Sequence, residues 1–151
     1  MTVTEVLAAG GTSYDVVEHP PARTESELHL TGLDVEQSVK TLAFTVGDDR
    51  RVVLVGIPGP ARLKYGELAR ALGVSRSQLR QASADVVQAL GMEPGGLSPI
   101  TDDVAVTVVF DAVVPAMGVV SCGGGTPTRT LVLEAADLVR ASPRVIVAPV
   151  S

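Results

Sequence analysis

Two short segments of this 151-residue chain carry residue types that could act on an anionic or electrophilic ligand. In the first, Lys40 interrupts the apolar run from Val39 to Phe44, and the chain has only one other lysine, Lys64, beside ten arginines. A compact ammonium group at such a position suits a phosphate or a carboxylate. The alternative is a lysine at a strand end that reaches solvent and binds nothing.

The second segment is the loop Gly95-Gly96-Leu97-Ser98-Pro99, which continues into Ile100. Its glycines allow a ligand to approach the backbone closely, and its proline stiffens the loop. Main-chain N–H groups held in this way can face a carbonyl oxygen or an oxyanion. A plain surface turn would use the same residues, so the segment alone leaves both interpretations open.

Four further side chains are candidate nucleophiles or ligand contacts. Ser98 and Ser121 both lie outside a Gly-x-Ser-x-Gly turn, and a catalytic triad would have to recruit His19 or His29 from far upstream. His19 precedes two prolines and is either a substrate contact or a hydrogen-bonded loop residue. Cys122 is either a reactive thiol or a small apolar residue, and its Val-rich surroundings favour the second interpretation.

Common phosphate-binding and metal-binding motifs are missing from the sequence. The stretch Gly123-Gly124-Gly125 is not followed by the Gly-Lys-Ser/Thr that cradles phosphates, and no Gly-x-Gly-x-x-Gly follows an early strand. A single cysteine excludes an intramolecular disulfide, and one cysteine with two histidines provides too few ligands for a typical zinc site. We therefore expect neither a metal nor another cofactor.

The composition, with 46% apolar and 19% charged residues, is that of one folded domain over residues 1–151. A net charge of −5 and a pI of about 4.9 argue against broad electrostatic coating of DNA or other nucleic acid. Residues 61–81 are an exception, because they contain five basic residues and one acidic residue, Glu67. This stretch is either a solvated helical face or a contact for nucleic acid. No apolar run is long enough to cross a membrane and no signal peptide is recognisable, so we expect a cytoplasmic protein.

Hydrophobic periodicity and turn residues predict helices and strands in irregular alternation. Helices are expected after the capping residues Thr2, Thr24 and Ser83, the second of them over 25–32, and also over 63–72 and 134–140. Strands are expected over 13–18, 39–46, 51–57, 104–110, 118–122, 129–133 and 144–150, and the turn at 47–50 predicts that the second and third pair antiparallel. A sustained βαβ pattern is absent. We therefore predict one α+β domain with a mixed, mostly antiparallel sheet surrounded by helices.

Taken together, these segments resemble the YbaK/EbsC family, which is similar to the editing domain inserted in bacterial prolyl-tRNA synthetases. The segments that match are Glu18-His19-Pro20, Ser38-Val39-Lys40-Thr41-Leu42, the loop from Gly95 to Ile100, Val119-Val120-Ser121-Cys122-Gly123, and Leu131-Val132-Leu133-Glu134 with Ala136-Asp137-Leu138. They follow the family's order and cover nearly the whole chain.

The resemblance implies a curled mixed sheet with flanking helices and a free-standing aminoacyl-tRNA deacylase. Such an enzyme hydrolyses mischarged aminoacyl-tRNA, most often Cys-tRNA(Pro) or Ala-tRNA(Pro), without a metal or a covalent enzyme intermediate. Its expected partners are the acceptor end of a mischarged tRNA and prolyl-tRNA synthetase.

The resemblance also implies roles for individual residues. Lys40 matches the family's key lysine, which anchors the 3′-terminal adenosine of the tRNA or its phosphate. The loop that contains Gly95, Gly96, Leu97 and Ser98 would position the aminoacyl carbonyl for attack by water or by the substrate's own thiol. These five residues are the catalytic candidates. The expected substrate-binding residues are His19, Thr41, Pro99, Ser121, Cys122 and Gly123.

Hydrolysis of an activated ester requires positioning and oxyanion stabilisation rather than a side-chain nucleophile, so the missing triad agrees with a deacylase. Two other interpretations stay open at this point. One is a non-catalytic module of the same fold that binds tRNA or a synthetase. The other is a thiol-dependent regulator that uses Cys122.

Overall fold

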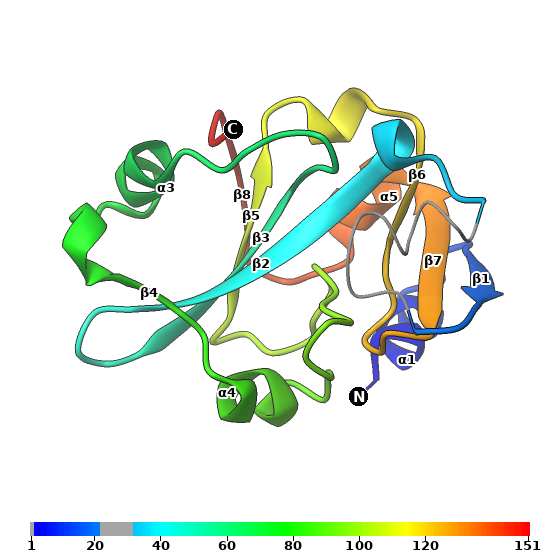
Figure 1. Cartoon of the computed structure of the whole chain (residues 1–151), viewed down its shortest axis with the longest axis horizontal. Coiled ribbons are helices and arrows are strands. Elements are labelled where there is room, and N and C mark those ends of the chain that lie inside the picture. The colour runs from blue at the N-terminus through cyan, green and yellow to red at the C-terminus, as the bar shows by residue number, and fades with distance from the viewer. Residues whose placement is uncertain (1, 22–31) are drawn as a thin grey trace.

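One mixed sheet of eight strands organises the chain in the computed structural model, which describes residues 2–21 and 32–151 (Figure 1). The strands are β1 (Asp15–Glu18), β2 (Ser38–Val46), β3 (Arg51–Pro58), β4 (Leu79–Gln81), β5 (Thr107–Asp111), β6 (Val119–Gly123), β7 (Arg129–Glu134) and β8 (Val145–Ala148). The α-helices are α1 (Val3–Ala9), α3 (Tyr65–Leu72), α4 (Ala84–Ala89) and α5 (Ala135–Arg140). The helix expected over 25–32 lies outside the described residues, apart from its last position.

Helix ends fall where the predicted capping residues stand. The side chain of Thr2 accepts a hydrogen bond from the backbone N–H of Glu5 at 3.3 Å, and the side chain of Ser83 accepts one from Val86 at 3.4 Å. These bonds satisfy N–H groups that the first turn of a helix leaves without a partner. At the other end of α3, Gly73 adopts the left-handed conformation (φ 69°) that favours glycine and ends the helix.

The β2–β3 hairpin crosses the middle of the sheet and carries the first site residues. Its strands pair antiparallel from Val39 opposite Pro58 to Val46 opposite Arg51, as the turn residues predict. The turn itself begins at Gly47, whose φ of 74° is one that side chains rarely adopt. The register of the hairpin therefore fixes which β3 residue lies opposite each residue of β2.

The strand order β1-β7-β6-β2-β3-β5-β8 joins two groups of strands through one short contact. This contact is the parallel pairing of β2 with β6, in which Ser38 lies opposite Ser121 and Val39 opposite Cys122. Among the described strands, β1–β7, β2–β3, β2–β4 and β6–β7 pair antiparallel, and β2–β6, β3–β5 and β5–β8 pair parallel. The sheet is therefore mixed, as predicted.

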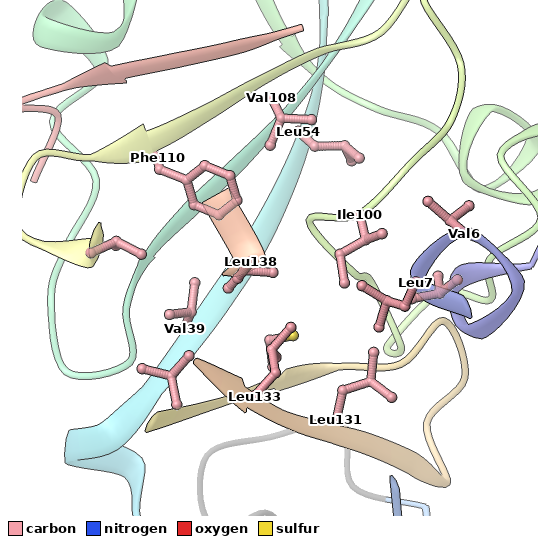
Figure 2. Packing of buried hydrophobic residues seen from close by; sticks show 14 of the residues in the cluster. Val6, Leu7, Val39, Leu54, Ile100, Val108, Phe110, Leu131, Leu133 and Leu138 are labelled. Carbon is pink, nitrogen blue, oxygen red and sulfur yellow. The ribbon is translucent and has the colours of Figure 1, made fainter. Parts of the chain in front are cut away.

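The core divides into two clusters of buried apolar side chains. In the larger one, Leu7 of α1, Leu131 of β7, Leu138 of α5 and Phe110 of β5 point into a common interior (Figure 2). Each of these four side chains is at most 1% exposed, which identifies them as the centre of the packing. The smaller cluster includes Leu68 of α3, which is fully buried.

Some predicted elements differ from the observed ones. The strand expected over 104–110 begins only at Thr107, because the Asp103 carboxylate accepts from Ala105 N at 2.9 Å and its carbonyl accepts from Val106 N at 3.1 Å, which forms a turn. The basic stretch 61–81 is not one helical face, since it spans α3, the 3₁₀ helix η2 (Arg76–Gln78) and β4. Two further short 3₁₀ helices, η1 (Val35–Gln37) and η3 (Val114–Ala116), were also not predicted.

Candidate active site

A cavity of about 300 Å³ lies where the start of β2, the end of β6, the start of β7 and the loop after α4 meet. We call it the Lys40 cavity. Its lining residues are His19, Val35, Ser38, Val39, Lys40, Thr41, Gly59, Gly95, Gly96, Leu97, Ser121, Cys122, Gly123, Thr126, Pro127, Arg129 and Thr130. Of the residues that the sequence marked as catalytic or substrate-binding, all but Ser98 and Pro99 are among them.

Glycines bring the walls of the cavity together. A Cβ atom on Gly96 would stand 2.2 Å from the carbonyl carbon of Thr126, and a Cβ atom on Gly123 would stand 1.9 Å from the carbonyl oxygen of Leu97. Backbone atoms cannot move aside as the end of a flexible side chain can. The loop after α4 therefore packs against β6 and the β6–β7 connection only because both positions lack a side chain.

The same loop has backbone N–H groups that donate to no described residue. The N–H of Gly96 donates to the carbonyl of Glu93 at 2.9 Å and is therefore occupied. The N–H groups of Gly95 and Leu97 donate to no residue within 2–21 or 32–151, and both residues line the cavity. Donors without a protein partner, held in a rigid loop, can bind a carbonyl oxygen or an oxyanion.

The cavity is electropositive although the protein as a whole is acidic. Lys40 is exposed on β2 and forms no ion pair with any residue that the structure describes. Arg129 also lines the cavity, and its guanidinium lies 3.6 Å from the carboxylate of Glu18, which is largely exposed. No aspartate or glutamate among the described residues lines the cavity. Lys40 is therefore available to an anionic ligand.

His19 follows β1 and reaches the cavity with both ring nitrogens engaged. Nδ1 lies 2.8 Å from the carbonyl oxygen of Pro20, and Nε2 lies 2.7 Å from the hydroxyl of Thr130. A carbonyl oxygen can only accept, so Nδ1 carries a hydrogen in this arrangement. His19 is therefore hydrogen-bonded within the protein and also lines the cavity together with Thr130, so its role as a substrate contact stays a prediction.

Three hydroxyl groups differ sharply in their surroundings. Ser121 lines the cavity, and its hydroxyl donates to none of the described residues. The Oγ1 atom of Thr41 is buried in the wall without a hydrogen-bond partner among the described residues, and a buried hydroxyl without a partner costs about 1–3 kcal/mol. Ser98 is fully buried behind the lining, also without a hydroxyl partner, and Pro99 is buried beside it. Neither Ser98 nor Pro99 lies on the cavity surface of this structure.

Cys122 forms part of the floor of the cavity. The residue is 3% exposed and packs in the larger apolar cluster, and burial raises the pKa of its thiol to about 12. A thiol with such a pKa stays protonated near neutral pH and is a poor nucleophile. The structure thus favours the packing role over the thiol-dependent regulator.

Some lining residues were not anticipated from the sequence. They are Thr126 and Pro127 in the β6–β7 connection and Arg129 and Thr130 at the start of β7. The sequence predicted only a tight connection and a strand there. The pairing of Gly123 with Thr130 places these residues beside the predicted site. Two polar residues, Arg129 and Thr130, at the start of a strand whose next three residues are apolar were the available signal.

Within the described ranges, no three histidine, cysteine, aspartate or glutamate side chains gather as a metal site would require. Helices of the described residues are all too short and polar to span a membrane. The Lys40 cavity itself brings together a cation, backbone N–H groups and hydroxyls around a space of small-molecule size.

Comparison with known proteins identifies the family. A sequence model of the aminoacyl-tRNA editing domain matches residues 19–141. Proline--tRNA ligases from two strains of Stenotrophomonas maltophilia, K279a and R551-3, are 29% and 30% identical to the chain over 113 residues. These residues make up 73% of this chain and 20% of each ligase, so the chain spans about a fifth of the length of these relatives.

Two solved structures resemble the fold over almost the whole chain. A candidate trans-editing enzyme for prolyl-tRNA synthetase shares 29% identity and a TM-score of 0.82, with 99% of this chain and 94% of that chain covered. The hypothetical protein APE2540 shares 30% identity and a TM-score of 0.82, with 98% and 97% covered. Since the family match includes the walls of the Lys40 cavity from His19 to Thr130, the chain belongs to the aminoacyl-tRNA editing domain family.

Proposed function

We propose that this protein is a trans-editing deacylase that hydrolyses mischarged aminoacyl-tRNA, with Cys-tRNA(Pro) or Ala-tRNA(Pro) as its substrate. The observation that carries the proposal is the Lys40 cavity. It combines the ammonium group of Lys40, which has no ion pair with a described residue, with the N–H groups of Gly95 and Leu97, which donate to no described residue. Family membership supports an editing role, and the similarity to proline ligases supports tRNA(Pro).

In this proposal Lys40 holds the 3′-terminal adenosine of the tRNA or its phosphate at the acceptor end. A charge-assisted contact to an anionic oxygen is among the stronger hydrogen bonds in proteins. Arg129 is a second cation at the same cavity, although Glu18 shares its charge. The ester bond would then lie beside the loop after α4.

In this proposal the N–H groups of Gly95 and Leu97 donate hydrogen bonds to the aminoacyl carbonyl oxygen. Water adds to the carbonyl carbon, and the negative charge that develops on the oxygen is stabilised by these donors. The bond between the carbonyl carbon and the ribose oxygen then breaks. The ribose oxygen leaves with a proton, which yields free amino acid and uncharged tRNA. For a cysteinyl ester, the substrate's own thiol can attack the carbonyl carbon in place of water. The C–S bond forms as the bond to the ribose oxygen breaks, and the thiol proton goes to that oxygen. The products are uncharged tRNA and a cyclic cysteine thiolactone, which water then hydrolyses to free cysteine.

The size of the cavity suits a small amino acid. A volume of about 300 Å³ must hold the aminoacyl group and part of the terminal nucleoside. A synthetase pocket rejects a slightly smaller side chain by only about 1–3 kcal/mol, so a separate hydrolytic site for small residues improves fidelity. The hydroxyls of Ser121 and Thr41 are the polar groups of this proposed substrate pocket.

The test is hydrolysis of a panel of labelled aminoacyl-tRNAs by the wild type and by Lys40→Ala. The panel contains Cys-tRNA(Pro), Ala-tRNA(Pro), Ser-tRNA and correctly charged Pro-tRNA(Pro), each with and without prolyl-tRNA synthetase. The wild type should release one mismatched amino acid selectively. For Lys40→Ala, kcat/KM should fall by about 100-fold or more, because a hydrogen bond to a charged group contributes up to about 3 kcal/mol. Circular dichroism should show that the variant is folded.

A charge-matched control is Arg144→Ala, because Arg144 is exposed, lines neither the Lys40 cavity nor the hollow described below, and has no ion pair with a described residue. Its activity should equal that of the wild type. Release that is undiminished in Lys40→Ala would contradict the proposed role of the lysine. If no substrate is hydrolysed while tRNA still binds, the chain is a non-catalytic binding module of the same fold.

A further inference from the structure

A second hollow of about 300 Å³ adjoins the Lys40 cavity. We call it the Tyr65 hollow. It shares Thr41, Gly95 and Leu97 with the Lys40 cavity, so the two spaces have a common wall. The two spaces are therefore neighbours, separated by these three residues.

Two aromatic rings and several apolar side chains line the Tyr65 hollow. Phe44 and Tyr65 line it with their ring centroids 5.8 Å apart and their planes nearly perpendicular, at 89°. Tyr65 is 41% exposed whereas Phe44 is 3% exposed, so Tyr65 is the ring that a ligand can reach. Gln81, whose exposed side-chain amide can both donate and accept, also lines the hollow.

Exposed cations lie next to Tyr65 and Gln81, two residues of the lining, although no cation among the described residues lines the hollow itself. The guanidinium of Arg76 lies 5.6 Å from the centre of the Tyr65 ring, and Arg80 precedes Gln81 on β4. Neither arginine, nor Arg62 or Lys64 beside α3, has an ion pair with a described residue. Aromatic side chains flanked by unpaired cations form the combination that binds single-stranded nucleic acid, because bases stack on the rings and phosphates pair with the charges.

We propose that the Tyr65 hollow binds one unpaired nucleobase of the 3′ end of the tRNA whose ester lies in the Lys40 cavity. The inference rests on the proposed function for the identity of the strand. Thr41 adds a second observation, since its buried hydroxyl lacks a partner at the wall between the two spaces and a nucleoside crossing that wall would supply one. An apolar peptide would fill the floor but would leave the cations unused, so the observations favour the base.

The experiment compares minihelix substrates that carry an abasic nucleotide at each of the three unpaired 3′ positions in turn. Wild type, Tyr65→Phe and Tyr65→Leu are assayed with every substrate. For the wild type and Tyr65→Phe, one abasic substitution should lower kcat/KM by about 5- to 150-fold, the factor expected when one stacked base is lost. The same substitution should leave Tyr65→Leu almost unaffected, because that variant has no ring to stack on. Arg144→Ala serves as the control and should behave as the wild type.

Binding of the same minihelices without an amino acid is measured in parallel, so the inference is tested even if no hydrolysis occurs. Dependence of affinity on the Tyr65 ring and on one particular base supports the hollow as a nucleobase site. If every abasic substitution affects wild type and Tyr65→Leu equally, the inference is wrong, while selective hydrolysis would leave the proposed function intact. If no ester is hydrolysed but binding still depends on Tyr65, the proposed function is wrong and the nucleobase site stands. Thermal unfolding of Tyr65→Leu checks that the variant is folded.

Discussion

Gly123 and Leu97 approach so closely that a Cβ atom at position 123 would stand 1.9 Å from the carbonyl oxygen of Leu97. The missing side chain of Gly123 thus sets the distance between the end of β6 and the loop that carries the free backbone donors. The position of those donors relative to Lys40 depends on a glycine that itself contacts the ligand space only through its backbone.

We expect Gly123→Ala to push this loop outward and to lower kcat/KM by about 10- to 100-fold, because small misplacements of catalytic donors are costly. Overpacking should also reduce the free energy of unfolding by about 1–3 kcal/mol. Gly66→Ala is the matched control, since a Cβ there meets nothing within 4 Å and the position lies inside α3. Aminoacyl-tRNA hydrolysis and urea unfolding measure both effects. Full activity of Gly123→Ala would show that the loop does not position the ester.

Thr41→Val should separate stability from activity. Valine keeps the shape of threonine and suits a strand, but it removes a buried hydroxyl that has no protein partner. The free energy of unfolding should therefore rise by about 1 kcal/mol, while hydrolysis falls if a bound nucleotide uses that hydroxyl. Thr45→Val, on the same strand but lining neither space, should leave hydrolysis unchanged. Unchanged turnover of Thr41→Val would remove Thr41 from the substrate contacts.

Cys122 should resist alkylation in the folded protein. Its thiol is buried and has a pKa of about 12, so the reactive thiolate is scarce at mildly alkaline pH. Mass spectrometry after iodoacetamide treatment should find little modification in buffer and complete modification in concentrated urea. Rapid modification of the native protein, without loss of circular dichroism, would restore the thiol-dependent regulator as an interpretation.

Asp111 should make the free energy of unfolding depend on pH in the acidic range. Burial of this carboxyl opposes ionisation, but backbone hydrogen bonds from Val113 at 3.0 Å and from Val150 and Ser151 at 2.9 Å outweigh burial and hold its pKa below the ordinary value. A lowered folded-state pKa means that the stabilisation is complete above the unfolded-state pKa of about 3.9 and is lost as pH falls through the folded-state pKa.

Asp111→Asn should accordingly cost about 1–3 kcal/mol at neutral pH, and the difference from wild type should shrink below about pH 4. Urea unfolding across this pH range measures it. Asp48→Asn is the control, because Asp48 is exposed in the β2–β3 turn and has no hydrogen bond or ion pair with a described residue. A constant difference between Asp111→Asn and wild type at all pH values would contradict this role of the carboxylate.

Local structure was largely predictable because it follows from neighbouring residues. The β2–β3 hairpin was expected from the turn at Gly47, and the ends of α1 and α4 from the hydroxyls of Thr2 and Ser83. The three residues of β4 offered no such pattern, since Arg80 and Gln81 are polar and the strand pairs only along the edge of β2. Its formation depends on a distant partner rather than on its own sequence.

The sheet order and the resulting cavity were not predictable from spacing. The resemblance brought Lys40 and the loop after α4 together, but no periodicity could show that β6 lies beside β2. Spacing also could not tell which residues of one loop face the ligand. Ser98 carries a reactive group and was expected at the site, yet it points into the interior, whereas Arg129 lines the cavity without having been expected there.

The short β2–β6 contact also has a consequence for the order of folding. Its register joins residues far apart in sequence, and the Gln37 side chain spans a similar separation when it donates to the carbonyls of Met117 and Val119 at 3.0 Å. Contacts between distant residues form late, because the chain must first lose the entropy of closing a long loop. Hairpin β2–β3 can form early, but the Lys40 cavity requires β6 and β7. A chain in which only the hairpin has formed therefore holds Lys40 without β6 and β7 beside it and lacks the Lys40 cavity.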